Sequence, residues 1–284
     1  EKYGYMPENL QTQSVSITLE MAYNDACVAR LAGYLGKKED EEHFNRRAHF
    51  YRNLFDKSSG FFRAKDDKGN WIEPFNPLTY GGNGGNPYTE GNAWQYLWFV
   101  PQDIPDFINL FGGQKAFGKK LDTFFTLTSD NKEKNGNASG FIGQYAHGNE
   151  PSHHCAYLYD YINRPERAAY YANKVMREQY KNSVDGYSGN EDCGQMSSWY
   201  ILSSMGFYPT DPASGRFDFG SPQFKRVEIS LPTGKKFIIT SDRKGDDDYI
   251  IKSIRLNGKV LRQHYITYKQ IMDGGTLEYK MTKK

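Results

Sequence analysis

Hydrophobic residues recur at helical spacing through the first part of the chain. Between residues 14 and 35 the apolar positions Val15, Leu19, Ala22 and Ala26 fall three or four residues apart, and Gly36 follows as a stop signal. Over residues 39–55 a second apolar stripe is flanked by charged positions. This pattern predicts two successive helices.

From residue 94 onward, segments that are apolar nearly all round take turns with segments that are apolar on one side only. The first kind predicts buried helices at residues 94–100, 151–162 and 195–205, and the second predicts surface helices at residues 115–128 and 165–180. In the helix at residues 115–128 we expect Lys119, Lys120 and Asp122 on the solvated face. A polar loop is expected at residues 129–149.

This alternation favours an α/α toroid, in which inner and outer helices take turns around an axis. The inner helices of a toroid run parallel, so the loops that precede them gather on one face. An ordinary helical bundle or an α-solenoid is the alternative, and it would require no chemistry at those loops.

Near the C-terminus the helical period gives way to short alternating runs separated by turns. Such runs occur at residues 227–231, 236–240, 249–256 and 276–281, with an Asn257-Gly258 turn among them. We therefore predict a mainly α fold with a β appendage. A helical toroid segment over residues 1–215 is followed by a small antiparallel β region over residues 216–284.

Charge and composition narrow the possible partners. Lys and Arg number 36 against 34 Asp and Glu, so a nucleic-acid partner gains no support from charge. No stretch approaches the roughly 20 apolar residues of a membrane span. The 22 Tyr, 18 Phe and 4 Trp are unusual, and tyrosine suits a carbohydrate cleft because it offers an apolar face and a hydroxyl. The three cysteines are far apart and indicate neither a disulfide framework nor a metal motif.

Three loops place carboxylates among Gly, Asn and aromatic or His residues, each ahead of a predicted helix. They are Tyr88-Thr-Glu-Gly-Asn-Ala-Trp94, residues 147–154 and residues 189–195. Two carboxylates that face each other across a toroid axis, Glu90 and Asp192, would suit acid and base roles in the hydrolysis of a glycosidic bond. The alternative for each is that it caps the helix that follows it.

The segment from His147 to His154 does not have the His-Glu-x-x-His spacing of zinc proteases. Its oxygen-rich neighbourhood, with Asn149, Glu150, Asn190, Glu191 and Asp192, suits a hard cation such as Ca²⁺ better. His153 and His154 are equally compatible with a structural role. Trp94 is expected in the core, with a place beside a sugar as the alternative.

At these residues the chain resembles glycoside hydrolase family 92, the calcium-dependent, exo-acting α-mannosidases of bacteria. The resemblance covers almost the whole chain and is carried by residues 14–20, 22–23, 53–56, 88–96, 98–101, 143–154, 156–159, 189–197, 206–209 and 220–222.

The resemblance implies inverting hydrolysis of terminal α-linked mannose, first of all α-1,2-linked mannose of N-glycans or mannan. It implies Glu90 as general acid and Asp192 as general base, with Ca²⁺ beside the sugar. Substrate contacts are expected from Asn149, Glu150, Trp94, His147 and Asn190. Metal contacts are expected from Glu150, Asn149 and Asp192. Gln102 stands where the family commonly has His, and Asn190 stands where some members have Asp.

Family members of this kind usually carry an N-terminal β-sandwich domain and further helices. The resemblance therefore implies a partial (α/α)6 toroid and a C-terminal portion, weakly active or inactive by itself, of a periplasmic, secreted or cell-surface enzyme. Two rival interpretations remain open. One is a calcium-independent glycosidase of another α/α-toroid family, and the other is a carbohydrate-binding fragment without catalysis.

Overall fold

A computed structural model describes residues 1–82, 84, 86–129 and 137–283 of the chain. The chain divides into two compact units, Glu1–Ser152 and His153–Lys284. This division lies upstream of the domain boundary predicted between residues 215 and 216. The predicted boundary marks the change from helices to strands, and it stays a prediction. Residues 130–136 of the predicted polar loop lie outside the described residues. In the part that is described, no helix has the length and apolar character needed to cross a membrane.

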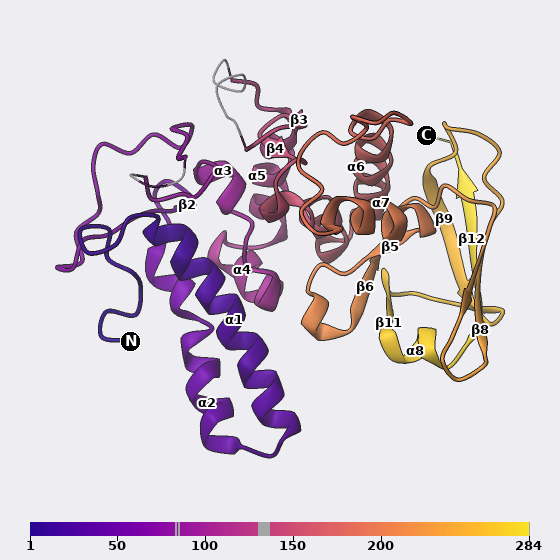
Figure 1. Cartoon of the computed structure of the whole chain (residues 1–284), viewed down its shortest axis with the longest axis horizontal. Helices are drawn as coiled ribbons and strands as arrows, with labels where there is room; N and C mark the ends of the chain where they lie inside the picture. The colour runs from indigo at the N-terminus through magenta and orange to yellow at the C-terminus, as the bar shows by residue number, and fades with distance from the viewer. Residues whose placement is uncertain (83, 85, 130–136, 284) are drawn as a thin grey trace. The chain divides into compact units, whose positions relative to one another are not determined.

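The first unit is mainly helical, with two short hairpins (Figure 1). Its elements are α1 (Ser14–Tyr34), α2 (Lys38–Arg47), η1 (Phe50–Leu54), β1 (Phe55–Asp56), β2 (Phe61–Phe62), α3 (Ala93–Tyr96), η2 (Pro101–Asp103), α4 (Ile104–Leu110), α5 (Gln114–Thr126), β3 (Phe141–Ile142), β4 (Tyr145–Ala146) and η4 (Glu150–Ser152).

Helices α1 and α2 lie alongside each other (Figure 1), and α1 has nearly the predicted length. The apolar stripe over residues 39–55 predicted a longer second helix than the structure has. Helix α2 ends at Arg47, and residues 50–54 form a 3-10 turn. Contacts from a distant segment favour this turn, because the Tyr51 hydroxyl and the Arg52 guanidinium both donate to the carboxylate of Asp106, at 2.5 and 2.7 Å. Tertiary contacts of this kind override local helix propensity.

The buried helix predicted at residues 94–100 is also short, since α3 ends at Tyr96. Pro101 disfavours helical backbone at Val100, and the Val100 amide donates instead to the Trp98 carbonyl at 2.8 Å. The turn directs the Trp98 side chain into the core, where none of the residue is exposed. Trp98 packs there against aromatic rings from α4, α5 and the connection between them: Phe107, Phe111, Phe117 and Phe124.

The second unit carries the helices α6 and α7, followed by two sheets and the short helix α8 (Figure 1). Its elements are η5 (Cys155–Ile162), α6 (Pro165–Glu178), α7 (Gln195–Met205), β5 (Phe207–Tyr208), η6 (Pro212–Ser214), β6 (Arg216–Phe219), β7 (Arg226–Ser230), β8 (Lys236–Ser241), β9 (Ile250–Leu256), β10 (Lys259–Val260), β11 (Tyr265–Thr267), α8 (Tyr268–Met272) and β12 (Gly275–Thr282). Helix α7 has the bounds predicted for it, whereas the segment predicted as a helix up to residue 162 forms the 3-10 helices η4 and η5.

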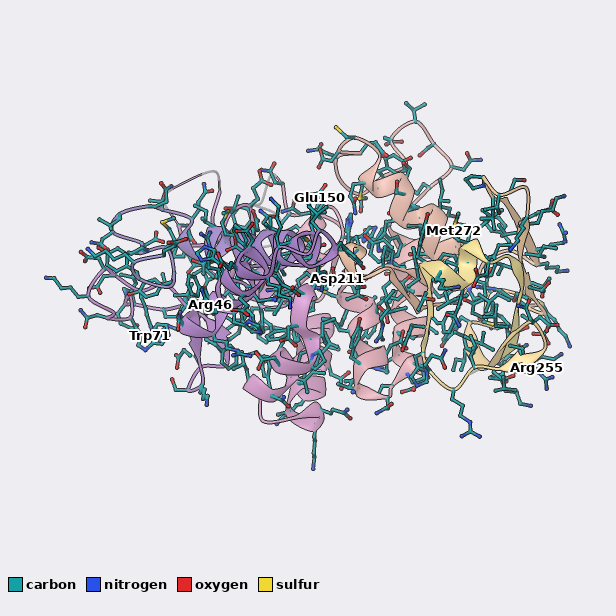
Figure 2. All side chains as sticks on the ribbon, turned by 90° about the horizontal axis from the view of Figure 1, so that it is seen from below. Arg46, Trp71, Glu150, Asp211, Arg255 and Met272 are labelled. Carbon is teal, nitrogen blue, oxygen red and sulfur yellow. The ribbon has the colours of Figure 1, made fainter. Side chains whose placement is uncertain are left out.

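The larger sheet has the strand order β10-β9-β12-β8-β7, and the smaller has the order β11-β6-β5. Strand β12 lies between β8 and β9 and runs parallel to β8, so the larger sheet is mixed rather than purely antiparallel as predicted. Side chains alternate between its faces. Phe237, Ile239 and Leu277 are buried in the core, whereas Arg255 is exposed and lies at the outer edge of the unit in Figure 2.

Two carboxylates are buried at the junction of η5 and the smaller sheet. Asp218 accepts hydrogen bonds from Thr210 and Tyr161 and pairs with Arg216. Neither carboxylate oxygen of Asp160 has a hydrogen-bond partner among the described residues. Burial raises the pKa of Asp160 well above its ordinary range, and the charge of Asp218 raises it further, against an opposing effect of Arg216.

We expect Asp160→Asn to stabilise the protein near neutral pH. The pKa of the Asp160 carboxyl is higher in the folded protein than in the unfolded chain, where it is about 4. Its contribution to the stability of the fold therefore falls as the pH rises from about 4 through the folded-state pKa. The asparagine amide carries no charge at any of these pH values. The increase in the free energy of unfolding of Asp160→Asn should reach about 1–3 kcal/mol at pH 7–8 and vanish near pH 4. Urea unfolding between pH 4 and 8 measures it, with exposed Asp185→Asn as the control. A loss of stability at every pH would contradict the expectation.

Candidate active site

The first unit holds Glu90 in a loop whose backbone is fixed on both sides. The Thr89 amide donates to the Ser16 hydroxyl of α1 at 2.9 Å, and the Thr89 hydroxyl donates to Gln13 at 2.8 Å. On the other side, the side-chain amide of Asn149 donates to the Glu90 backbone carbonyl at 3.3 Å. These contacts bring two predicted site residues, Glu90 and Asn149, together.

Glu90 has a backbone φ of 51°, in the left-handed region that residues other than glycine rarely adopt. Its half-buried side chain forms no hydrogen bond or ion pair with any described residue. The helix that follows is capped by Asn92, whose side chain accepts from the amides of Trp94 and Gln95, while the Gln95 side chain accepts from the Asn92 amide. The capping alternative for Glu90 is therefore wrong, and the Glu90 carboxylate has no structural hydrogen bond among the described residues.

The capping pair is anchored to the second hairpin of the unit. Gln95 donates to the Gln144 carbonyl at 2.7 Å, and Asn92 donates to the Gln144 side chain at 3.3 Å. All three side chains are buried. A network of satisfied buried amides is rigid, so it fixes the position of the loop that carries Glu90.

A second carboxylate, Glu20 of α1, lies near Glu90 and was given no role by the sequence analysis. The Tyr96 hydroxyl donates to it at 3.1 Å. Loss of water around the carboxyl raises the pKa of Glu20, the Tyr96 hydrogen bond lowers it, and the charge of Glu90 raises it further. Glu20 belongs to the first matching motif, but only the fold reveals its closeness to Glu90.

The structure buries Trp94, as the core interpretation expected, and also His147, whereas the substrate contacts given for both stay predictions. Trp94 is 6% exposed and packs edge-to-face on Phe61, with ring centroids 4.8 Å apart. His147 is fully buried and bonded to the Tyr145 hydroxyl at 2.7 Å. Neither ring can touch a sugar from this position unless its surroundings move.

Lys120 is a further residue that the sequence pattern misplaced. Its ammonium is not on a solvated face but lies over the rings of Phe61 and Trp94, 3.4 and 4.5 Å from their centroids. Burial lowers the pKa of Lys120 to about 8. Both aromatic partners are distant in sequence, so helical periodicity alone could not identify this contact.

In the second unit, Asp192 lies in the loop that precedes α7. Asp192, Cys193 and Gly194 have consecutive positive φ values of 49°, 60° and 96°. The Asp192 side chain is exposed and makes no hydrogen bond among the described residues. The N-cap of α7 is Gly194. The nearby carboxylate that accepts from the first turn is Glu191, from the Ser197 amide at 3.3 Å and its hydroxyl at 2.5 Å. The capping alternative for Asp192 is therefore wrong as well.

The two carboxylates thus share an unusual condition. Each is held on a left-handed backbone, which costs of order 1–3 kcal/mol, and neither is the N-cap of the helix that follows it. Strained residues with uncommitted polar groups cluster at functional sites. The structure therefore favours a chemical role for both Glu90 and Asp192 over a structural one.

The residues present have the donor chemistry of a calcium site. Glu191 Oε2 is buried without a hydrogen-bond partner among the described residues, and Asn190 and Asp192 flank it in sequence. In the first unit, considered by itself, the half-buried Asn149 and Glu150 carry oxygen donors of the same hard kind. No three His, Cys, Asp or Glu side chains of the described residues form a ready metal cluster. Amide, backbone or water oxygens would have to complete the shell.

The chain was compared with known families and structures. The family described as the glycosyl hydrolase family 92 catalytic domain matches residues 1–283. A curated relative from the fungus Arthroderma benhamiae, named an uncharacterized secreted glycosidase, is 31% identical over all of this chain and 37% of its own length.

Two solved structures from Bacteroides thetaiotaomicron resemble the chain closely. A family 92 α-mannosidase in complex with mannoimidazole has a TM-score of 0.93 and 38% identity, over 99% of this chain and 38% of that protein. A family 92 inverting mannosidase has a TM-score of 0.87 and 37% identity, over 99% of this chain and 39% of that protein. The chain thus spans less than two fifths of the length of these relatives.

These likenesses confirm the predicted fold class, part of a helical toroid followed by a small β region, with the correction that the larger sheet is mixed. The chain belongs to glycosyl hydrolase family 92.

Proposed function

We propose that this chain carries the acid and base of an inverting α-mannosidase that removes terminal α-linked mannose from glycans. Family membership and the mannosidase and inverting-mannosidase neighbours support the reaction class. The observation that carries the proposal is the pair of uncommitted, backbone-strained carboxylates, Glu90 and Asp192. An α-1,2 linkage in N-glycans or mannan is the substrate we propose first.

In this mechanism Glu90 donates a proton to the glycosidic oxygen as the bond between that oxygen and the anomeric carbon breaks. Asp192 accepts a proton from a water molecule, which attacks the anomeric carbon from the opposite side and inverts its configuration. Asn149 holds the Glu90 backbone, and with Glu150 it would contact the leaving group. Asn190 would contact the sugar beside Asp192. Such a mechanism requires roughly 6.5–9.5 Å between the two carboxyl groups, a distance that an inhibitor complex would measure.

Calcium is part of the proposal. Glu150, Asn149 and Asp192 would hold it, and the buried, unpartnered Oε2 of Glu191 would add a further donor. A bound Ca²⁺ would supply positive charge for the sugar hydroxyls and for an attacking water. We further propose that the chain acts together with an N-terminal β-sandwich domain and works outside the cytoplasm, as the name of the secreted fungal relative suggests.

The anomeric configuration of the first product tests the reaction. We expect proton NMR of a methyl α-mannoside digest to show β-mannose before mutarotation, because a single displacement inverts the α-linked carbon. The assay should use both the 284 residues and a polypeptide of the relatives' length that contains them. Appearance of α-mannose first would contradict the inverting mechanism, and hydrolysis of glucosides in preference to mannosides would contradict the substrate.

Removal of calcium is a separate test. We expect EDTA to reduce mannose release by the longer polypeptide at least tenfold and added Ca²⁺ to restore it, since the donors are hard oxygens. Added Zn²⁺ serves as the control, because these oxygen donors do not favour it. Full activity after chelation would favour the rival interpretation of a calcium-independent glycosidase.

A further inference from the structure

A cavity of about 400 Å³ opens beside α7 in the second unit. It is lined by Tyr180, Lys181, Asn182, Tyr187, Ser197, Tyr200 and Ile201. Its volume lies at the lower end of the range for small-molecule sites. Neither Asp192 nor Glu191 lines it, although Tyr187 comes from the same loop as Asp192 and Ser197 donates to Glu191.

Three tyrosine rings form the apolar part of the cavity. The Tyr180 ring lies 4.8 Å from that of Tyr200 and 5.8 Å from that of Tyr187, measured between centroids. Tyr180 is held from behind, because it stacks on the buried ring of Trp199 at 5.9 Å and donates its hydroxyl to the Met196 carbonyl at 2.9 Å. The central ring is therefore pre-positioned, while Tyr187 remains 44% exposed.

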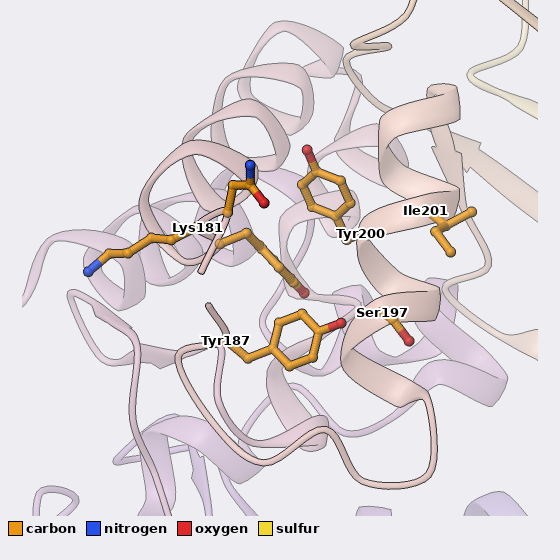
Figure 3. Close-up of a pocket in the computed structure, with 7 residues that line it drawn as sticks. Lys181, Tyr187, Ser197, Tyr200 and Ile201 are labelled. Carbon is orange, nitrogen blue, oxygen red and sulfur yellow. The ribbon is translucent and has the colours of Figure 1, made fainter. Parts of the chain in front are cut away.

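The backbone also fixes the two walls relative to each other. Tyr180 and Tyr187 pair as an antiparallel bridge that closes the loop between them, and the Lys181 amide donates to the Gly186 carbonyl at 2.8 Å. Gly186 is required there, since a Cβ would lie 2.1 Å from the Lys181 carbonyl oxygen. On the opposite wall, Ser197, Tyr200 and Ile201 come from successive turns of α7 (Figure 3).

Polar groups surround the rings without being used by the fold. The hydroxyls of Tyr187 and Tyr200 and the side-chain amide of Asn182 have no hydrogen-bond partner among the described residues. Figure 3 shows the Tyr187 hydroxyl directed toward α7, whereas the Lys181 side chain extends away from the other labelled residues. Flat aromatic faces beside unused donors and acceptors match the apolar ring faces and hydroxyl rim of a pyranose.

We propose that this cavity is a second carbohydrate-binding site that holds one pyranose ring of a glycan, separate from the carboxylates that carry out hydrolysis. Tyr180 and Tyr187 contact the apolar face of the sugar, and Asn182 and the Tyr200 hydroxyl bind its hydroxyls. Such a site would hold a branched or polymeric glycan near the enzyme between cleavage events, raising its effective concentration.

Titration of methyl α-D-mannopyranoside into the 284-residue chain, followed by saturation-transfer NMR and calorimetry, tests this site. We expect saturable binding with a Kd of about 1 mM, the affinity typical of a ligand of this size. Tyr187→Ala should weaken it at least tenfold and Tyr187→Phe should weaken it less, because the ring face is kept. The exposed Tyr34→Ala is the matched control and should leave binding unchanged.

Two further variants separate this site from the catalytic one. Glu90→Gln and Asp192→Asn should retain the binding, whereas its loss in either variant would assign the sugar to the catalytic site and overturn the proposal. Unchanged binding in Tyr187→Ala and Asn182→Ala would also overturn it. Binding by the 284 residues that disappears in a polypeptide of the relatives' length would identify the cavity as a surface for another part of the protein, against the proposal.

Discussion

Replacement of Glu90 by glutamine is expected to lower kcat/KM for an unactivated α-mannoside by a factor of about 10² to 10⁴. The change removes the proton that the leaving oxygen needs but keeps the size of the side chain. The expected loss corresponds to about 3–5 kcal/mol of transition-state stabilisation. Because the Glu90 side chain makes no hydrogen bond among the described residues, the substitution should not alter the stability of the loop.

The leaving group distinguishes an acid from a residue that merely positions the substrate. A dinitrophenyl leaving group departs without protonation, so Glu90→Gln should retain most of its activity on dinitrophenyl α-mannoside. Asp192→Asn should lose activity on both substrates, because the attacking water needs its base in each case. These rates should be measured in the longer polypeptide, with exposed Glu39→Gln as the control. An equal loss on both substrates in Glu90→Gln would contradict its role as general acid.

Glu90 and Asn92 show which features of the candidate site could be predicted from the sequence and which could not. Residue types and their place before an apolar segment were enough to select the loop, and the family resemblance selected the carboxylate. Sequence could not decide whether Glu90 capped the helix, because Glu, Gly and Asn all precede it within four positions. The decision depends on backbone geometry, in which Asn92 takes the extended cap conformation and Glu90 the left-handed one.

Long helices with clear stops were predicted well, and short apolar segments were not. Helix α7 is followed by Gly206 in a left-handed conformation, a local signal that sequence displays directly. The segment after Trp94 is equally apolar, but its backbone turns at Pro101. Its Trp98 ring packs against aromatic rings of α4 and α5. Apolarity indicates burial in both cases, yet it does not specify the backbone that achieves it.

Long-range partners account for most of what the sequence left unresolved. The helical periodicity places Lys120 on the face predicted to be exposed to solvent. Tertiary packing instead brings its ammonium over the rings of Phe61 and Trp94. Strand β12 has the alternation of an ordinary antiparallel strand, but the crossover through β11 and α8 returns it parallel to β8. Neither the ring contact nor the strand direction is encoded in a local pattern.

Trp98→Ala is expected to lower the free energy of unfolding of the first unit by about 3–5 kcal/mol. Trp98 is fully buried, and its ring lies 5.3 and 5.4 Å from the rings of Phe117 and Phe124. Truncation removes the whole indole and leaves a cavity that these rigid rings cannot fill by small movements. Trp98→Phe keeps most of the contact and should cost less, while Trp71→Ala on the half-exposed hairpin is the control.

The same substitution connects the core to the proposed acid. Trp98 is six residues beyond Asn92, in the segment that continues α3, so loosening its packing should also release the capped loop that holds Glu90. We expect amide hydrogen exchange at Thr89 and Glu90 to accelerate in Trp98→Ala and to stay unchanged in Trp71→Ala, because exchange reports local opening. Urea unfolding followed by near-ultraviolet circular dichroism measures the stability. A loss below about 1 kcal/mol, or a loss without faster exchange in the loop, would show that the aromatic core does not support the site.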